Sequence, residues 1–134
     1  MSAVRPRSGD MSAQPRKILV GVDGSEPAER ALDRAADLAG YGSTLTVVSV
    51  ARDGDRYAAG PLEHARERLL RRHVSATYLQ PVGDPAAELV EAARELGADL
   101  VVLGRRSRSL RRLVLGSVSD SVVRRAPCDV LVVR

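Results

Sequence analysis

Short aliphatic runs alternate along this chain with stretches in which apolar residues recur at helical spacing. Continuous apolar runs favour strands covered on both faces, and the periodic stretches favour amphipathic helices. The third run mixes polar and apolar residues, as an edge strand would. The pattern predicts the order β-α-β-α-β-α-β-α-β, with strands at 17–22, 44–50, 74–79, 99–103 and 129–133.

Capping residues indicate where the predicted helices begin and end. Ser25 precedes a helix with a proline in its first turn, and Asp84 before a proline opens the clearest helix of the chain. Gly97 follows that helix, and the last helix must end before Pro127. The second helix is marked by the apolar residues Leu62, Ala65, Leu69 and Leu70.

Aliphatic strands separated by helices imply one α/β domain over residues 17–134. The expected architecture is a three-layer sandwich, in which a five-stranded parallel sheet carries helices on both faces. Right-handed crossovers and one reversal of winding give the strand order 3-2-1-4-5. Sheets of this kind bind ligands beyond the carboxyl ends of the strands at the reversal. The turn 23–25 and the segment 104–117 are therefore expected to meet there.

The segment 104–117, GRRSRSLRRLVLGS, connects a predicted strand to a predicted helix. Gly104 lets the backbone turn sharply and approach a ligand. Gly116, Ser117 and Ser119 can present backbone N–H groups and hydroxyls to a phosphate at the helix entrance. A purely structural role fits as well, in which Gly104 ends a strand and Ser117 caps a helix.

Asp23, in the first strand-to-helix turn, is the second candidate for a binding role. A carboxylate there suits a ribose hydroxyl or, beside bound phosphates, an indirect contact to Mg²⁺. Aspartate is also common in turns that follow strands. Gly21 and Val22 lead into this turn and Arg105 follows Gly104, so these three residues complete the candidate site.

Other chemistries lack their motifs. The chain has neither G-x-x-x-x-G-K-[ST] nor a complete G-x-G-x-x-G, which excludes a P-loop NTPase and a dinucleotide fingerprint. His64 and His73 lie on one predicted helix at a spacing unsuited to shared metal ligation, and we expect both to be solvated or partly packed. Cys128 is expected to act as a small buried hydrophobe. No catalytic residues are expected.

Charge and composition narrow the partners and the compartment. The formal charge is +4, with five arginines in 104–117, so basicity is local. This allows a polyanion site through Arg105–Arg112, but a chain with three Tyr and no Phe or Trp offers few platforms for stacking bases, and nucleic acid is not expected as a partner. One cysteine, no secretory signal and no bilayer-length apolar run indicate a cytoplasmic protein without membrane insertion. Residues 1–16 show no hydrophobic period and are expected to form a disordered tail, with Met11 as an alternative start.

The chain resembles the universal stress protein family in three segments, KILVGVDGS at 17–25, ADLVVLG at 98–104 and LGSVSDSVVRRAPCDVLVVR at 115–134. The resemblance covers residues 17–134 and implies an adenine-nucleotide-binding α/β sandwich that usually dimerises. It implies places around bound ATP for seven residues: Asp23 near the ribose or phosphates, Val50 at the adenine, and Gly104, Ser107, Gly116, Ser117 and Ser119 around the phosphates.

The chain departs from the family's ATP pattern, G-x-x-G, nine residues, then G-[ST]. Its fourth position is Ser107, and eight residues separate this serine from Gly116. A serine restricts the backbone where glycine does not, whereas the flanking arginines can attract phosphate. Two functions therefore remain open: a stress-response regulator that binds ATP, with Mg²⁺, without efficient catalysis, and a nucleotide-free interaction module.

The last aliphatic run, 129–133, is expected to lie at an edge of the sheet. Aliphatic edges of this kind tend to pair with another chain. We therefore expect a homodimer joined through antiparallel pairing of the two last strands about a two-fold axis.

Overall fold

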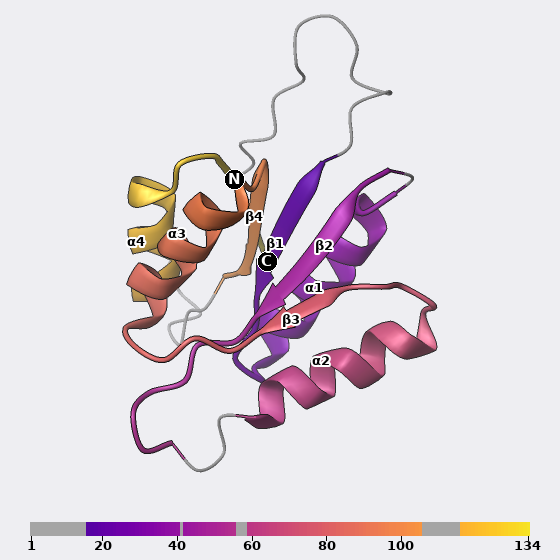
Figure 1. The fold of residues 1–134 in the computed structure, drawn as a ribbon, viewed down its shortest axis with the longest axis horizontal. Coiled ribbons are helices and arrows are strands. Elements are labelled where there is room, and N and C mark those ends of the chain that lie inside the picture. The colour runs from indigo at the N-terminus through magenta and orange to yellow at the C-terminus, as the bar shows by residue number, and fades with distance from the viewer. Residues whose placement is uncertain (1–15, 41, 56–58, 106–115) are drawn as a thin grey trace, which may run out of the picture.

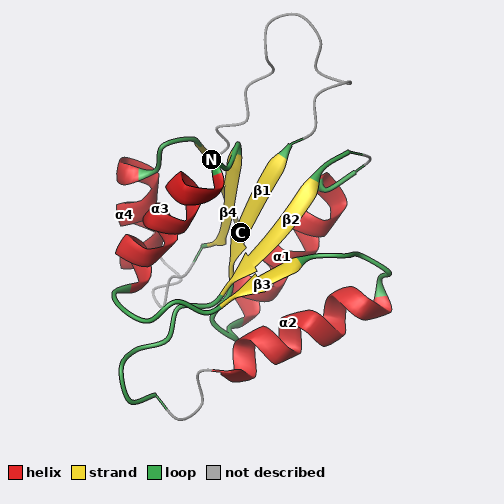
Figure 2. Ribbon diagram, viewed as in Figure 1, coloured by secondary structure: helices red, strands yellow, loops and turns green. Residues whose placement is uncertain are grey.

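Five parallel strands and four helices follow one another in the order predicted from the sequence. The computed structural model describes residues 16–40, 42–55, 59–105 and 116–134. The sheet has the order β3-β2-β1-β4-β5 and carries helices on both faces (Figure 1, Figure 2), which confirms the predicted fold class. The strands are β1 Lys17–Gly21, β2 Thr44–Val48, β3 Thr77–Leu79, β4 Leu100–Gly104 and β5 Asp129–Val133. The helices are α1 Glu26–Leu38, α2 Ala59–Arg71, α3 Pro85–Leu96 and α4 Ser117–Arg125.

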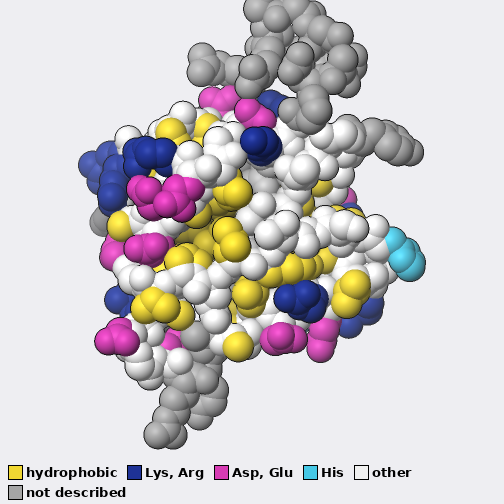
Figure 3. All heavy atoms as spheres, viewed as in Figure 1, with side chains coloured by type: hydrophobic (Ala, Val, Ile, Leu, Met, Phe, Trp, Pro, Cys, Tyr) yellow, Lys and Arg dark blue, Asp and Glu magenta, His cyan; other side chains and the backbone are white. Residues whose placement is uncertain are grey.

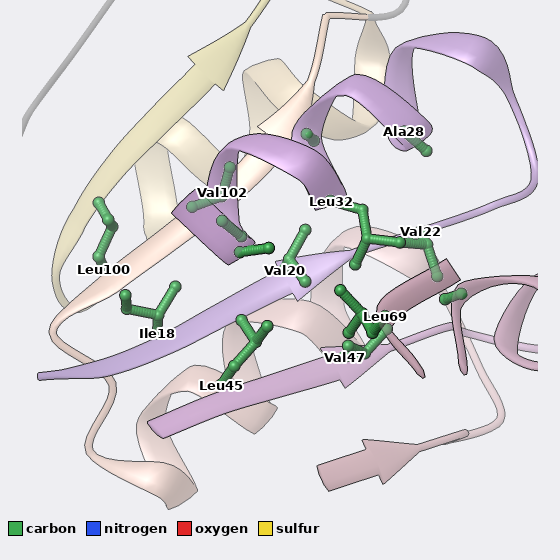
Figure 4. Packing of buried hydrophobic residues seen from close by; sticks show 14 residues of the cluster. Ile18, Val20, Val22, Ala28, Leu32, Leu45, Val47, Leu69, Leu100 and Val102 are labelled. Atoms are coloured by element: carbon green, nitrogen blue, oxygen red, sulfur yellow. The ribbon is translucent and has the colours of Figure 1, made fainter. Parts of the chain in front are cut away.

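Two aliphatic cores lie on opposite faces of the sheet. Ile18 and Val20 of β1 pack with α1 and α2 in one core, which Figure 4 shows. Leu19 points the other way and packs with α3 and α4. Successive strand residues thus enter different cores, and this is why β1 and β4 contain unbroken aliphatic runs. On the face drawn in Figure 3, hydrophobic side chains occupy the centre and charged ones gather over the helices at its margins.

Side-chain caps fix the starts of two helices where the sequence predicted them. The Ser25 hydroxyl accepts a hydrogen bond from the Ala28 N–H at 3.3 Å, and the Asp84 carboxylate accepts one from the Ala87 N–H at 3.0 Å. At the other end of α3, Gly97 adopts the left-handed conformation, with φ of 65°. A residue with a Cβ is strained there, so glycine ends this helix.

Strands β2 and β3 are shorter than predicted. β3 covers Thr77–Leu79 rather than 74–79, and β2 ends at Val48. After β2, Ala51 forms an isolated parallel bridge with Val82, so the chain beyond β2 stays beside the chain beyond β3. Residues 1–15 of the predicted N-terminal tail lie outside the described residues. The last residue of that predicted tail, Arg16, is described, and its carbonyl accepts a hydrogen bond from the Thr44 N–H.

Helix α2 differs most from its prediction. It begins at Ala59, ahead of Leu62, the first of the apolar residues that marked this helix in the sequence. Leu70, which we placed on its apolar face, is 64% exposed, so that placement was wrong. Ala65 and Leu69 fill the buried positions, and the residue after Leu69 is turned about 100° away from them around the helix.

A ladder of three side-chain contacts joins α2 and the residue that follows it to α1. His64 contacts Glu29, Arg68 binds Asp33 through two hydrogen bonds of 2.8 Å, and Arg72 contacts Asp37. Each pair is separated by 35 residues in sequence, so the two helices run in the same direction with matched turns. We call these six residues the α1–α2 ladder.

Candidate functional site

A cavity of about 380 Å³ opens at the carboxyl ends of the parallel strands, where β1 and β4 are neighbours and the winding reverses. The strand ends and the first turns of the helices meet around it (Figure 1). The turn 23–25 shares this cavity with Gly104 and Ser117, the two ends of the segment 104–117, as the strand order predicted. The predicted residues that line it are Gly21, Val22, Asp23, Val50, Gly104, Ser117 and Ser119.

Three further candidates do not contribute to the described wall. Arg105 and Gly116 are neighbours in sequence of lining residues but do not line the cavity themselves. The Arg105 N–H donates to the Val133 carbonyl at 2.7 Å and so continues the pairing of β4 with β5. Ser107 lies outside the described residues, as do the arginines at 106, 108, 111 and 112.

Asp23 closes a turn and also lines the cavity. One carboxylate oxygen accepts hydrogen bonds from the Ser25 N–H at 3.0 Å and from the Ser25 hydroxyl at 2.5 Å, which closes a turn. Asp23 is exposed and lines the cavity. The turn therefore fixes a carboxylate at the mouth of the site.

Gly104 stands where β4 passes closest to α1. A Cβ placed on it would lie 2.3 Å from the Pro27 carbonyl oxygen and 2.8 Å from the Ala28 nitrogen. Backbone atoms cannot yield as a flexible side chain can, so only glycine fits. Its contact with α1 is thus a packing requirement, and the same close approach brings the α1 entrance to the cavity wall.

The amino end of α4 faces the cavity through Ser117, Val118 and Ser119. Gly116, not Ser117, is the N-cap residue, so the proposed capping role of Ser117 is wrong. In this turn the Asp120 N–H donates to the Gly116 carbonyl at 2.9 Å, which closes the first turn of the helix. The N–H groups before it have no acceptor within the helix, and helix ends of this kind attract anions.

Ser119 differs from Ser117 in its surroundings. Its side chain is buried, and its hydroxyl donates to the Gly104 carbonyl at 3.0 Å. Ser117 is exposed. Of the two α4 hydroxyls expected around a phosphate, that of Ser119 is therefore bonded to the protein backbone.

The end of β2 forms the opposite wall, and here the sequence-based prediction was incomplete. It singled out Val50, whereas Ser49, Arg52 and Asp55 also line the cavity. The Asp55 N–H donates to the Arg52 carbonyl at 3.0 Å, so a tight turn brings both charged residues to the rim. The strand order contained the necessary signal, because it places the loop after the second strand beside the loop after the first.

Two more missed contributions come from helix starts. Pro61 of α2 and Pro85 of α3 line the cavity, as does Leu89 one turn further along α3. Proline is common in first helical turns for backbone reasons alone. Nothing in the sequence distinguished these prolines as wall residues.

The described lining residues supply hydroxyls, two aspartates and one arginine, but no His, Cys or Lys. His64 instead contacts Glu29 in the α1–α2 ladder, and burial raises the pKa of the half-buried Cys128 thiol to about 11, with help from the Asp129 and Asp99 carboxylates. Within the described ranges, no three His, Cys, Asp or Glu side chains cluster as metal ligands would. Within the same ranges, no helix has the length and apolar character to cross a membrane.

Comparison with known proteins gives one consistent result. A model of the universal stress protein family matches residues 15–134. Universal stress protein YxiE of Bacillus subtilis is 31% identical over 88% of this chain and 98% of its own length. The structure of a universal stress protein from Archaeoglobus fulgidus superposes with a TM-score of 0.78, at 29% identity, over 89% of this chain and 98% of that one.

A ligand-bound structure is also similar. A universal stress protein crystallised in complex with cAMP has a TM-score of 0.74 and 30% identity, over 89% of this chain and 96% of its own. The family match spans the whole described fold, and the relatives are covered almost from end to end. This chain belongs to the universal stress protein family.

Proposed function

We propose that this protein binds an adenine nucleotide, ATP with Mg²⁺, in the cavity at the carboxyl ends of β1 and β4. The observation that carries the proposal is that one cavity joins the Asp23 turn, the amino end of α4 and the apolar wall at Val50. These three features come from segments far apart in sequence. Each suits a different part of a nucleotide.

The dimensions of the site suit a molecule with an anion at one end and a ring at the other. β2 and β4 lie on either side of β1, so their ends are two strand spacings apart, about 10 Å. Phosphates would lie at the α4 N–H groups and Ser117, and adenine would lie across β1 against Val50. The volume of about 380 Å³ is in the usual range of small-molecule sites.

Asp23 lies between these two ends and suits a ribose hydroxyl or a phosphate-bound Mg²⁺. Magnesium commonly binds through one or two carboxylates together with substrate phosphates. The described part of the chain has no three-ligand cluster for it, so the ion would enter with the nucleotide. Because one Asp23 oxygen already accepts two hydrogen bonds from Ser25, we assign this carboxylate a binding role rather than that of a base.

The similar protein crystallised with cAMP supports an adenine ligand at this fold. Regulation is the proposed outcome of binding: the nucleotide alters the shape or partner affinity of the protein during a stress response, in the cytoplasm and without efficient hydrolysis. Family membership supports the stress-response role.

Calorimetric titration with ATP and Mg²⁺ tests the proposal. Wild type should bind, and Asp23→Asn should weaken binding about tenfold, because it removes the charge while keeping the shape. Asp53→Asn is the matched control, since Asp53 is exposed and does not line the cavity. Absence of heat with wild type at millimolar ATP would reject nucleotide binding.

A nucleotide-free interaction module is the second candidate. The observation that favours it is Ser107 in place of the family's second glycine, in a segment one residue short. It predicts that heat-denatured, purified protein releases no adenine absorbance and that titration gives no heat. Released nucleotide would favour the first candidate.

A further inference from the structure

Ser119 is tied to the backbone of another element. It is 3% exposed, and its hydroxyl donates to the Gly104 carbonyl oxygen at 3.0 Å. Buried hydroxyls are normally hydrogen-bonded, because leaving them unpaired is costly. Its proton therefore has an acceptor within the protein.

The acceptor itself cannot move easily. Gly104 is pressed against the Pro27–Ala28 backbone so closely that a Cβ would not fit. The next residue, Arg105, donates its N–H to Val133 of β5 at 2.7 Å. The Gly104 carbonyl is thus held from two sides and makes a fixed point for whatever binds it.

The bond sets the position of the α4 entrance relative to β4. It joins residues 15 apart in sequence, on either side of the segment 106–115. The N-cap of α4 is a glycine, which has no side chain to fix the first turn. The Ser119 bond therefore ties the turn that carries these N–H groups to the end of β4.

We infer that Ser119 is a positioning residue, which holds the α4 N–H groups against the cavity through Gly104, and is not itself a phosphate ligand. The inference rests on the proposed function for the identity of the anion. It corrects the sequence-based expectation that Ser117 and Ser119 act alike. Ser117, exposed at the cavity, keeps the role of ligand.

Ser119→Ala tests the inference, with Ser117→Ala and Ser121→Ala as matched variants of the same helix. Ser121 does not line the cavity, and its hydroxyl accepts from Arg125 at 3.2 Å. The first measurement is amide hydrogen exchange at Asp120 without nucleotide, because its N–H donates to Gly116. We expect about tenfold faster exchange in Ser119→Ala alone.

The second measurement compares ATP with adenosine in the same titrations. Ser119→Ala should lose about tenfold in ATP affinity and keep adenosine affinity within about twofold, since only the phosphate end is displaced. Ser117→Ala should weaken ATP binding without changing amide exchange at Asp120. Ser121→Ala should change neither the ATP affinity nor this exchange.

Weakened ATP binding with unchanged Asp120 exchange in Ser119→Ala would make Ser119 a direct ligand and overturn the inference. Equal losses of affinity for ATP and for adenosine in Ser119→Ala would mean that the whole site is loosened, and would also overturn the inference. So would a variant with unchanged affinity and unchanged exchange. If wild type binds no ATP, the proposed function fails, and the exchange arm alone then decides whether Ser119 positions α4.

Discussion

Gly104 meets three demands at one backbone position. It ends β4, it allows α1 to approach, and its carbonyl receives the Ser119 hydroxyl. The sequence pointed to Gly104 as a turn that faces a ligand, but it held no sign of the contact with Pro27. Tight packing between distant segments leaves no local pattern, so the place of Gly104 at the cavity was predictable and its packing role was not.

Gly104→Ala should lower the free energy of unfolding by about 2–3 kcal/mol, because the new methyl group would overlap the Pro27 carbonyl. Urea denaturation measures the change. Gly40→Ala is the control: a methyl group added there would meet no atom within 4 Å, so it should change stability by less than about 0.5 kcal/mol. Equal stability of the Gly104→Ala variant and wild type would contradict the close approach.

The elements differ in how far the sequence determined them. α3 was predicted well, because Asp84 caps one end and Gly97 closes the other. α2 has no such signals, and it packs against the sheet mainly through Ala65 and Leu69. Much of its placement comes from the α1–α2 ladder, whose pairs become visible only when both helices are known to run in the same direction. Charge pairs between distant segments cannot be recognised from any local pattern in the chain.

Asp33 gives the ladder a pH dependence. Its hydrogen bonds with Arg68 lower the pKa of the carboxyl below 3.8, with smaller help from Arg72. The stabilisation is therefore complete above pH 3.8 and is lost as the pH falls through the lowered folded value.

Asp33→Asn should reduce the free energy of unfolding at pH 7 by about 0.5–1 kcal/mol, since the pair is partly exposed. The difference from wild type should narrow once the pH falls below 3.8. Urea denaturation of Asp33→Asn and wild type, at pH 7 and below pH 3.8, measures this difference. Asp37→Asn, at a carboxylate that is 62% exposed, should cost less. If Asp33→Asn loses as much free energy of unfolding below pH 3.8 as at pH 7, the charge of Asp33 is not the cause of the loss.

At the scale of the whole molecule, β3 and β5 form the two edges of the sheet, as the predicted strand order required. β3 has three residues, Thr77–Leu79, whereas β5 has five, with Leu131 and Val133 half-buried. An unpaired aliphatic edge invites pairing with a second chain. We therefore propose a homodimer joined through residues 129–133. The arginines from 106 to 112, on which the polyanion hypothesis rests, lie outside the described residues.

Light scattering should give the mass of a dimer at tens of micromolar. Amide exchange at β5 should slow as protein concentration rises, because antiparallel pairing would protect its outer N–H groups. β3 is the internal control, and its exchange should not depend on concentration. A monomeric mass, or equal behaviour of both edges, would exclude the dimer through β5.

The anchoring of Gly104 also bears on where the sequence can change without altering the fold. Arg105 is held by Val133, and the α4 entrance is held by Ser119, so both stems of the intervening segment are hydrogen-bonded to residues outside it. Insertions, deletions or grafted sequences between 106 and 115 would then leave the surrounding architecture intact. Ligand preference could diversify through this interval while the sheet beneath it stays under separate selection.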